Sequence, residues 1–200
     1  MKSITKKEIY SPYDLSHIFR VNQDTIQSWL KERRMESFRV PGGHLRVTHQ
    51  SLEIYMKLNH YPEPENWDGK VEKFKTLVVE DDGDLLETMA ELLEEEPRLE
   101  VKTENNGLSA SLQIASWHPD LILLDFVMPG MDGFDICKKI RGNLDTKDIP
   151  VLAVTALSNF ENVKAVFDTG VSDFLEKPFY SEGLLSKVRG LLGISLIHHA

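Results

Sequence analysis

Four consecutive apolar residues that end at an acid constrain this chain more than any other feature of its sequence. The run at 121–124 (LILL) predicts a strand buried on both faces, which is typical of a parallel sheet covered by helices. The run stops at Asp125, and the carboxyl end of a central strand is where open α/β sheets place their ligands. The turn residues at 129–130 and 132–133 should leave Asp125 at the rim of a crevice.

Three other apolar runs also end in polar residues, namely Glu80 with Asp81, then Thr155, and then Lys177. If the strands are parallel neighbours, all of these groups converge on one edge of the sheet. Crowded carboxylates repel one another unless a hard cation joins them, and Mg²⁺ suits carboxylate oxygens combined with phosphate oxygens. Thr155 and Lys177 could then contact a phosphoryl group carried on Asp125. Solvated strand ends and helix caps would explain one such residue better than they explain four.

These residues resemble the motifs of the receiver domains of two-component response regulators over about residues 74–193. Glu80 and Asp81 match the acidic pair of that family, and Asp125 matches its phosphoacceptor. Thr155 matches its switch hydroxyl and Phe174 its switch aromatic. Lys177 and Pro178 match its Lys-Pro motif. The loop at 128–133 is also similar to that of the family.

The resemblance implies a CheY-like, flavodoxin-like (βα)5 fold over 74–194 with strand order 2-1-3-4-5. Regular alternation predicts a parallel sheet with right-handed crossovers. We expect strands at 74–79, 99–103, 121–125, 151–155 and 173–176. We expect helices at 84–95, 107–117, 133–141, 159–169 and 181–192.

The same resemblance implies a function for the site. A sensor histidine kinase or phosphotransfer protein would phosphorylate Asp125, with Mg²⁺ held by Glu80, Asp81, Asp125 and the Val127 carbonyl. After phosphorylation, Thr155 would bond a phosphoryl oxygen and Phe174 would turn inward. Two chains would then form a homodimer through the face at 159–192. The expected chemistry is confined to self-phosphotransfer and autodephosphorylation at Asp125, so an enzyme acting on an external substrate has little support.

The charge of the chain is unevenly distributed. The whole chain has 23 basic and 32 acidic residues, a net charge of −9. Residues 1–59 contain ten basic and six acidic residues (+4), which leaves 13 basic and 26 acidic residues (−13) in the remainder. This asymmetry is a modest indication that the N-terminal part contacts nucleic acid.

The N-terminal part predicts two short helices, a hairpin and a third helix. Ser11 and Pro12 are typical of a helix start, and Asn22 is a suitable cap for a second helix at 23–31. Ile26, Trp29 and Leu30 should pack inward, and Gln23 should be exposed with the other polar positions of that helix. The 41–43 segment (PGG) predicts a hairpin turn that projects Arg39, His44 and Arg46 as a basic wing. A third helix should follow Thr48 over 49–58.

The block at 8–59 resembles the winged helix-turn-helix domain of excisionase and MerR-type regulators, and the resemblance rests on Val21, Thr25, Trp29, Phe38-Arg39 and the wing at 41–44. It implies a DNA-binding domain whose second helix enters the major groove. The residues expected to contact DNA are Gln23, Thr25, Gln27, Ser28, Lys31, Arg33, Arg34, Arg39, His44 and Arg46. The alternative is a small module that binds a protein partner, which the acidic Asp24 and the uncharged Ser28 favour slightly.

The whole chain is therefore expected to be a transcription regulator whose DNA binding depends on phosphorylation, with a stiff linker at 60–73 that contains Trp67. No apolar run is long enough to span a membrane and the first seven residues lack an apolar signal core, so we expect a cytoplasmic protein. The single Cys137 should be an inert buried thiol. The charged runs at 94–96 and 138–139 should be solvated helix surface, and His198 and His199 should belong to the tail.

Overall fold

The computed structural model describes residues 6–62, 64, 73–130, 132–157 and 159–194. The chain divides into two compact units. The N-terminal unit is built from residues up to Lys73 other than Pro41–Gly43, and the main part of the C-terminal unit begins at Phe74. Most of the predicted linker at 60–73, including Trp67, lies outside the described residues, as do His198 and His199.

The N-terminal unit combines three helices with a small antiparallel sheet. Its strands pair in the order β1-β3-β2, and its third helix directly follows β3. A single 3-10 turn, η1, joins β2 to β3, and Gly42 in that turn has a φ of 81°. In chain order, the elements from residue 9 to residue 58 are β1 (Ile9–Tyr10), α1 (Pro12–Phe19), α2 (Gln23–Lys31), β2 (Phe38–Arg39), η1 (Pro41–Gly43), β3 (Leu45–Thr48) and α3 (His49–Leu58).

Side-chain caps explain where these helices begin. The side chains of Ser11, Asn22 and Thr48 accept hydrogen bonds from backbone N–H groups in the first turns of α1, α2 and α3. Ile26 and Leu30 are buried as predicted, whereas Trp29 is only half-buried and packs against Phe19 at a ring-centroid distance of 5.6 Å. The helix starts were therefore predictable from local chemistry.

The C-terminal unit contains one parallel sheet of five strands, in the order β5-β4-β6-β7-β8. Counted from β4 as the first strand, this order is 2-1-3-4-5. The strands are β4 (Phe74–Val79), β5 (Leu99–Glu104), β6 (Leu121–Leu124), β7 (Val151–Thr155) and β8 (Asp173–Glu176). The register pairs Val79 of β4 with Leu124 of β6, so that these two strands end at the same level.

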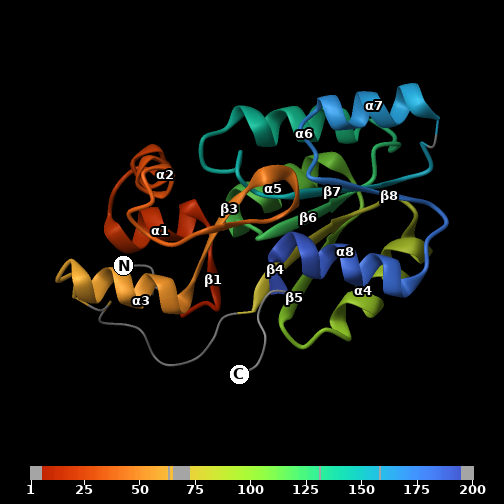
Figure 1. Ribbon diagram of the computed structural model, residues 1–200. Coiled ribbons are helices and arrows are strands. Elements are labelled where there is room, and N and C mark those ends of the chain that lie inside the picture. The colour runs from red at the N-terminus through yellow and green to blue at the C-terminus, as the bar shows by residue number, and fades with distance from the viewer. Residues whose placement is uncertain (1–5, 63, 65–72, 131, 158, 195–200) are drawn as a thin grey trace. The chain divides into compact units, whose positions relative to one another are not determined.

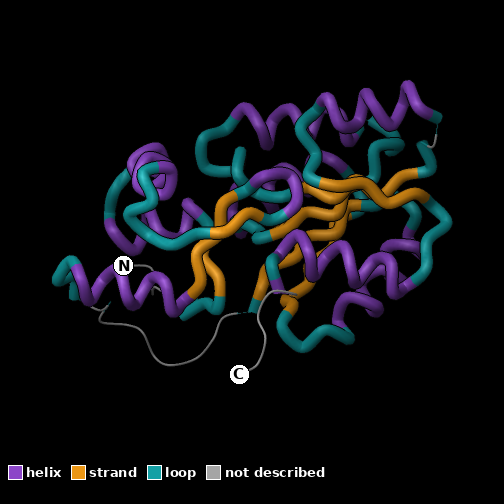
Figure 2. The backbone as a smooth tube through the Cα atoms, viewed as in Figure 1, coloured by secondary structure: helices purple, strands orange, loops and turns teal. Residues whose placement is uncertain are grey.

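Helices cover both faces of this sheet (Figure 1). α4 and α8 lie on one face, and α5, α6 and α7 cover the other (Figures 1 and 2). The residues of β6 are fully buried, as the apolar run predicted. The helices are α4 (Gly83–Glu94), α5 (Gly107–Trp117), α6 (Gly133–Gly142), α7 (Phe160–Asp168) and α8 (Ser181–Leu192).

The predicted bounds are close to the observed ones, with small differences at element ends. β6 stops at Leu124 rather than at Asp125, and β5 extends to Glu104. α4 begins one residue earlier than predicted, because the Asp82 side chain accepts hydrogen bonds from the N–H groups of Asp84 and Leu85. The predicted buried position of Cys137 is confirmed, and its thiol lies 3.5 Å from the Thr169 carbonyl oxygen.

The prediction that the run at 94–96 is solvated helix surface is wrong for Glu96. This residue follows α4 and is only 5% exposed. Its carboxylate accepts hydrogen bonds from Arg98 Nε at 2.8 Å and from Arg189 Nε at 2.9 Å. Glu96 therefore links the end of α4 to the start of β5 and to α8. The other predicted surface pair, Lys138 and Lys139, is exposed as expected.

Among the described residues, none of the helices combines the length and the apolar composition needed to cross a membrane.

The Glu96 contacts predict a pH-dependent contribution to stability. The hydrogen bonds from Arg98 and Arg189 lower the pKa of Glu96 to about 2, Arg98 being the larger influence and burial opposing it. A depressed folded-state pKa stabilises the protein above the ordinary carboxyl pKa, and this contribution is lost as pH falls through the folded pKa. Both arginines are about one-third exposed, so screening limits its size.

We therefore expect Glu96→Gln to reduce the free energy of unfolding of the C-terminal unit by about 1–2 kcal/mol at pH 7. The difference from the wild type should shrink between pH 4.5 and pH 2. Urea unfolding at several pH values measures this effect, and Glu95→Gln, at an exposed neighbouring position, is the matched control. A loss of stability that did not depend on pH would contradict the ionic role of Glu96.

Candidate functional site

The ends of β4 and β6 bring three carboxylates together. Glu80 and Asp81 follow β4, Asp125 follows β6, and the Asp125 N–H donates to the Val79 carbonyl at 3.0 Å. One side-chain oxygen from each of Glu80, Asp81 and Asp125 lies within 4.8 Å of the others. The parallel register therefore produces the cluster that the ends of the apolar runs predicted.

Lys177, which comes after the edge strand β8, joins this cluster. Its Nζ lies 2.6 Å from Glu80 Oε2 and 2.7 Å from Asp125 Oδ2. Its backbone N–H donates to the Thr155 carbonyl at 3.0 Å, which holds the start of the β8–α8 loop against the end of β7. One ammonium thus links side chains that follow two different strands.

Burial and hydrogen bonding shift the pKa values of Glu80 and Lys177. Glu80 is 2% exposed, and burial raises its pKa above the ordinary value despite the hydrogen bond from Lys177. Burial alone would lower the pKa of Lys177, but its hydrogen bonds to Asp125 and Glu80 outweigh burial and raise it. The ammonium therefore remains charged near neutral pH.

The donor set fits a divalent cation. When all three carboxylates are ionised, their three negative charges and the single ammonium leave a net charge of −2. The ligand atoms that this cluster offers are carboxylate oxygens, which hard cations such as Mg²⁺ prefer. Glu80, Asp81 and Asp125 are therefore the residues that could hold Mg²⁺, and the role of the Val127 carbonyl as a further ligand stays a prediction.

The loop after β6 holds the Asp125 carboxylate. Asp125 is 5% exposed, and its Oδ1 accepts a hydrogen bond from the Val127 N–H at 2.9 Å. Gly133 begins α6 directly behind this loop, where an added Cβ would lie 2.5 Å from the Asp125 carbonyl oxygen and 2.7 Å from Phe126 Cα. Only glycine allows this approach, which gives a physical reason for the Asp132-Gly133 pair.

The two predicted switch residues lie on the neighbouring strands. Thr155 is the last residue of β7 and is fully buried, and its hydroxyl oxygen lies 3.5 Å from the Leu157 nitrogen. Phe174 on β8 is half-buried and packs against the core beneath α5, α6 and α7. Their switching roles stay predictions.

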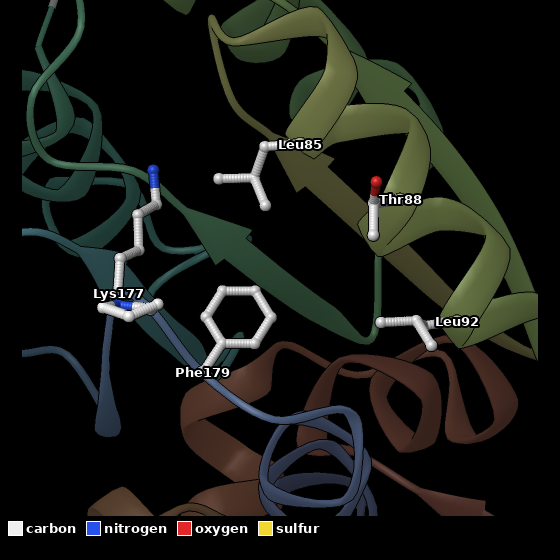
Figure 3. A pocket seen from close by; sticks show the side chains of 6 residues that line it. Leu85, Thr88, Leu92, Lys177 and Phe179 are labelled. Carbon is white, nitrogen blue, oxygen red and sulfur yellow. The ribbon is translucent and has the colours of Figure 1, made fainter.

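The sequence did not predict an apolar pocket beside the carboxylate site. The pocket has a volume of about 380 Å³, and three of its lining residues lie along one side of α4. Figure 3 shows the Phe179 ring between Lys177 and Leu92, with Leu85 and Thr88 along the helix. The 85, 88 and 92 spacing on α4 is a helical one, so periodicity could have indicated this face.

In the N-terminal unit, the residues predicted to contact DNA differ in exposure. Thr25 is half-buried, and its hydroxyl donates to the Asn22 side chain at 2.7 Å. Arg34 pairs with Glu32 at 2.7 Å, and Glu32 also accepts a hydrogen bond from Ser28 at 2.9 Å. Ser28, Lys31, Arg33, Arg34 and Arg39 are exposed, Thr25, Gln27 and His44 are half-buried, and Gln23 and Arg46 are buried.

The predicted exposure of Gln23 and Arg46 is wrong. Gln23 is 8% exposed because it lies on the same face of α2 as the core residues Ile26 and Leu30. Arg46 is 5% exposed and donates to the Leu45 carbonyl at 2.9 Å. It lies on β3, the central strand of the small sheet, rather than projecting from the hairpin tip.

Comparison with known proteins shows what the C-terminal unit resembles. The sequence model of the response regulator receiver domain matches residues 76–189. The chain is 36% identical over 118 residues to the DNA-binding dual master transcriptional regulator RpaA of Synechocystis, a match that covers 59% of this chain and 48% of that protein. It is 37% identical over 118 residues to the response regulator MprA of Mycobacterium tuberculosis, covering 59% and 50%. The chain thus spans about half the length of these curated relatives.

Solved structures show the same fold. A putative response regulator from Chloroflexus aurantiacus is 34% identical with a TM-score of 0.56, covering 61% of this chain and 99% of that one. The chemotaxis response regulator CheY4 of Vibrio cholerae is 28% identical with a TM-score of 0.56, covering 60% and 98%. The receiver domain of DrrB activated by BeF3 is 30% identical with a TM-score of 0.55, covering 60% and 98%.

The carboxylate cluster predicts metal binding that depends on Asp81. Removing one of three carboxylates should weaken Mg²⁺ binding by about tenfold or more, because few ligands share the ion and each carboxylate contributes a full charge. Titration calorimetry of Asp81→Ala with Mg²⁺ measures this loss. Asp84→Ala removes an exposed carboxylate outside the cluster and is the control. Equal affinities for Asp81→Ala and the wild type would show that Asp81 is not a ligand.

Proposed function

The chain belongs to the family defined by the response regulator receiver domain, and from this premise we propose that phosphorylation of Asp125 controls DNA binding by the N-terminal unit. The observation that supports the proposal most strongly is the bridging of Glu80 and Asp125 by the Lys177 ammonium, beside the third carboxylate of Asp81. This arrangement combines a nucleophile, a metal-binding donor set and a fixed cation.

The proposed reaction is phosphoryl transfer to Asp125 from a phosphohistidine on a sensor histidine kinase or phosphotransfer protein. An Asp125 carboxylate oxygen attacks the phosphorus in line, so that an O–P bond forms as the P–N bond to the donor imidazole breaks. The Val127 N–H and the Lys177 ammonium hold the two oxygens of the carboxylate before the reaction. Lys177 can then move to a phosphoryl oxygen as charge develops there.

Mg²⁺ would complete this arrangement. When bound by Glu80, Asp81, Asp125 and the Val127 carbonyl, Mg²⁺ would neutralise negative charge on the phosphoryl oxygens. Hydrolysis of the acyl phosphate would return the chain to its starting state. We propose that the chemistry of the site is confined to this transfer and hydrolysis at Asp125.

We propose that the phosphorylated site is read through Thr155 and Phe174. Thr155 would turn its hydroxyl to a phosphoryl oxygen, and Phe174 would move from its half-buried position into the space released. This movement would repack the face formed by residues 159–192, through which two chains would form a symmetric homodimer. Dimerisation would join two weak DNA-binding modules and raise their effective affinity.

We propose that the N-terminal unit is a winged helix-turn-helix domain. The tight turn between α1 and α2 and the β2–β3 hairpin support this proposal, as does the net charge of +4 on residues 1–59. The relative RpaA is a DNA-binding transcriptional regulator. The buried Gln23 and Arg46 favour the competing proposal, a module that binds a protein, since they reduce the set of available contacts.

The acceptor role of Asp125 predicts that Asp125→Asn abolishes phosphorylation, because an amide is not a nucleophile for this transfer. Incorporation of hydroxylamine-sensitive label from a small phosphodonor such as acetyl phosphate measures the reaction, because hydroxylamine cleaves an acyl phosphate. Asp84→Asn leaves the cluster intact and should be labelled like the wild type. Label retained on Asp125→Asn would place the acceptor elsewhere.

DNA binding predicts a role for the exposed Arg39. Arg39→Ala should weaken binding almost equally across sequences and reduce the slope of log affinity against log salt by about one unit. Arg39→Lys keeps the charge and should keep the slope. If Arg39 only pairs with a nearby acid such as Glu36 or Glu53, the alanine variant should lower the melting temperature slightly and leave the slope unchanged.

A further inference from the structure

Two arginines in the N-terminal unit have left-handed backbone conformations. Arg20, the C-terminal cap of α1, has a φ of 55°, and Arg33, two residues beyond the end of α2, has a φ of 56°. Glycine adopts this conformation readily, whereas other residues carry a steric penalty that asparagine, aspartate and histidine tolerate best. His60 and His118 also have positive φ values, and histidine is among the tolerant residues. Arginine is not, so backbone conformation alone would favour glycine at both positions.

Backbone hydrogen bonds maintain these two turns. Past the end of α1, the Val21 N–H donates to the Ser16 carbonyl at 3.0 Å. Past the end of α2, the Arg34 N–H donates to the Trp29 carbonyl at 3.0 Å. Both bonds reach back five residues and close the helix end around a left-handed residue. The side chains of Arg20 and Arg33 take no part in them.

Both guanidiniums are available for a ligand. Arg20 and Arg33 are exposed, and within the described part of the chain neither side chain forms a hydrogen bond or ion pair. The acid beside Arg33 is Glu32, whose two carboxylate oxygens accept hydrogen bonds from Ser28 and Arg34. Two residues that are unfavourable for the backbone thus carry charged groups that the fold does not use.

Arg20 and Arg33 flank α2, the helix that is expected to enter the major groove. Arg20 precedes α2 and Arg33 follows it, and a helix of nine residues is about 13 Å long. The major groove of DNA is about 12 Å wide. Flexible side chains at the two ends of a helix in that groove can therefore reach phosphates on its opposite walls.

We propose that Arg20 and Arg33 are paired phosphate contacts that bracket α2 on DNA. Arg20 is a new contact, since no motif in the sequence indicates it. The proposal rests on the DNA-binding function proposed above. A structural alternative is that each arginine only offsets the negative end of its helix dipole.

Substitution by glycine separates these roles, because it removes the charge and relieves the backbone together. For Arg20→Gly and Arg33→Gly we expect a melting temperature that is unchanged or raised. We also expect weaker DNA binding, with the salt slope reduced by about 0.9 unit for each variant and by about 1.8 units for the double variant. Stability and binding should thus change in opposite directions or independently, as expected for residues retained for function.

The experiment titrates the full chain with a labelled random-sequence duplex at about 50 to 200 mM salt, with Mg²⁺ and beryllofluoride present. Arg20→Lys and Arg33→Lys keep both the charge and the backbone penalty, and they should keep the wild-type slope. Lys57→Gln removes an exposed basic residue on α3 and controls for general charge loss, so its slope should change much less than that of either glycine variant.

Three outcomes would overturn the proposal. A wild-type slope in the double glycine variant would show that the arginines do not contact phosphate, while DNA binding itself stood. A fall in melting temperature of more than about 4 °C, with the slope unchanged, would assign the arginines to fold stability. Absence of salt-dependent binding by the wild type would remove both this proposal and the function on which it rests.

Discussion

The contact between the Lys177 ammonium and the carboxylates of Glu80 and Asp125 is the interaction on which the rest of the C-terminal unit depends. Three carboxylates at one sheet edge, two of them nearly inaccessible to water, would repel one another strongly without a cation. Lys177 supplies that cation from a residue 97 positions away from Glu80 in the chain. The parallel strand order makes this possible, because the side chains that follow β4, β6 and β8 emerge at one edge.

The surrounding helices hold this edge in place and connect it to the rest of the unit. α8 carries ion pairs from Lys187 to Asp173 at the start of β8 and from Arg189 to Glu96 beyond α4. Asp173 precedes the proposed switch residue Phe174, so the pair with Lys187 fixes the backbone next to the position that would move. The N-terminal unit follows a different rule, since its turns are maintained by the backbone and many of its basic side chains remain exposed.

The sequence predicted the elements and the site where one local rule decides the outcome. Apolar runs specified buried strands, and the residues that end them necessarily gathered where parallel strands end. The sequence failed where the outcome depends on a distant partner or on which face of an element the fold buries. Glu96 could not be distinguished from its exposed neighbours without Arg189, 93 residues away. Gln23 has the helical spacing of Ile26 and Leu30, but its polarity suggested exposure. Arg46 was misplaced because β3 buries two successive residues, Arg46 and Val47, so simple alternation fails.

We propose, as the point on which the rest of the function depends, that the chemical state of Asp125 determines how the N-terminal unit binds DNA. The most direct measurement compares the binding of one DNA duplex by the wild-type chain with and without beryllofluoride, at constant Mg²⁺ and salt, with the oligomeric state recorded alongside. We expect beryllofluoride to shift the chain toward a dimer and to tighten DNA binding. Superimposable binding curves, with beryllofluoride shown to occupy the site, would contradict it.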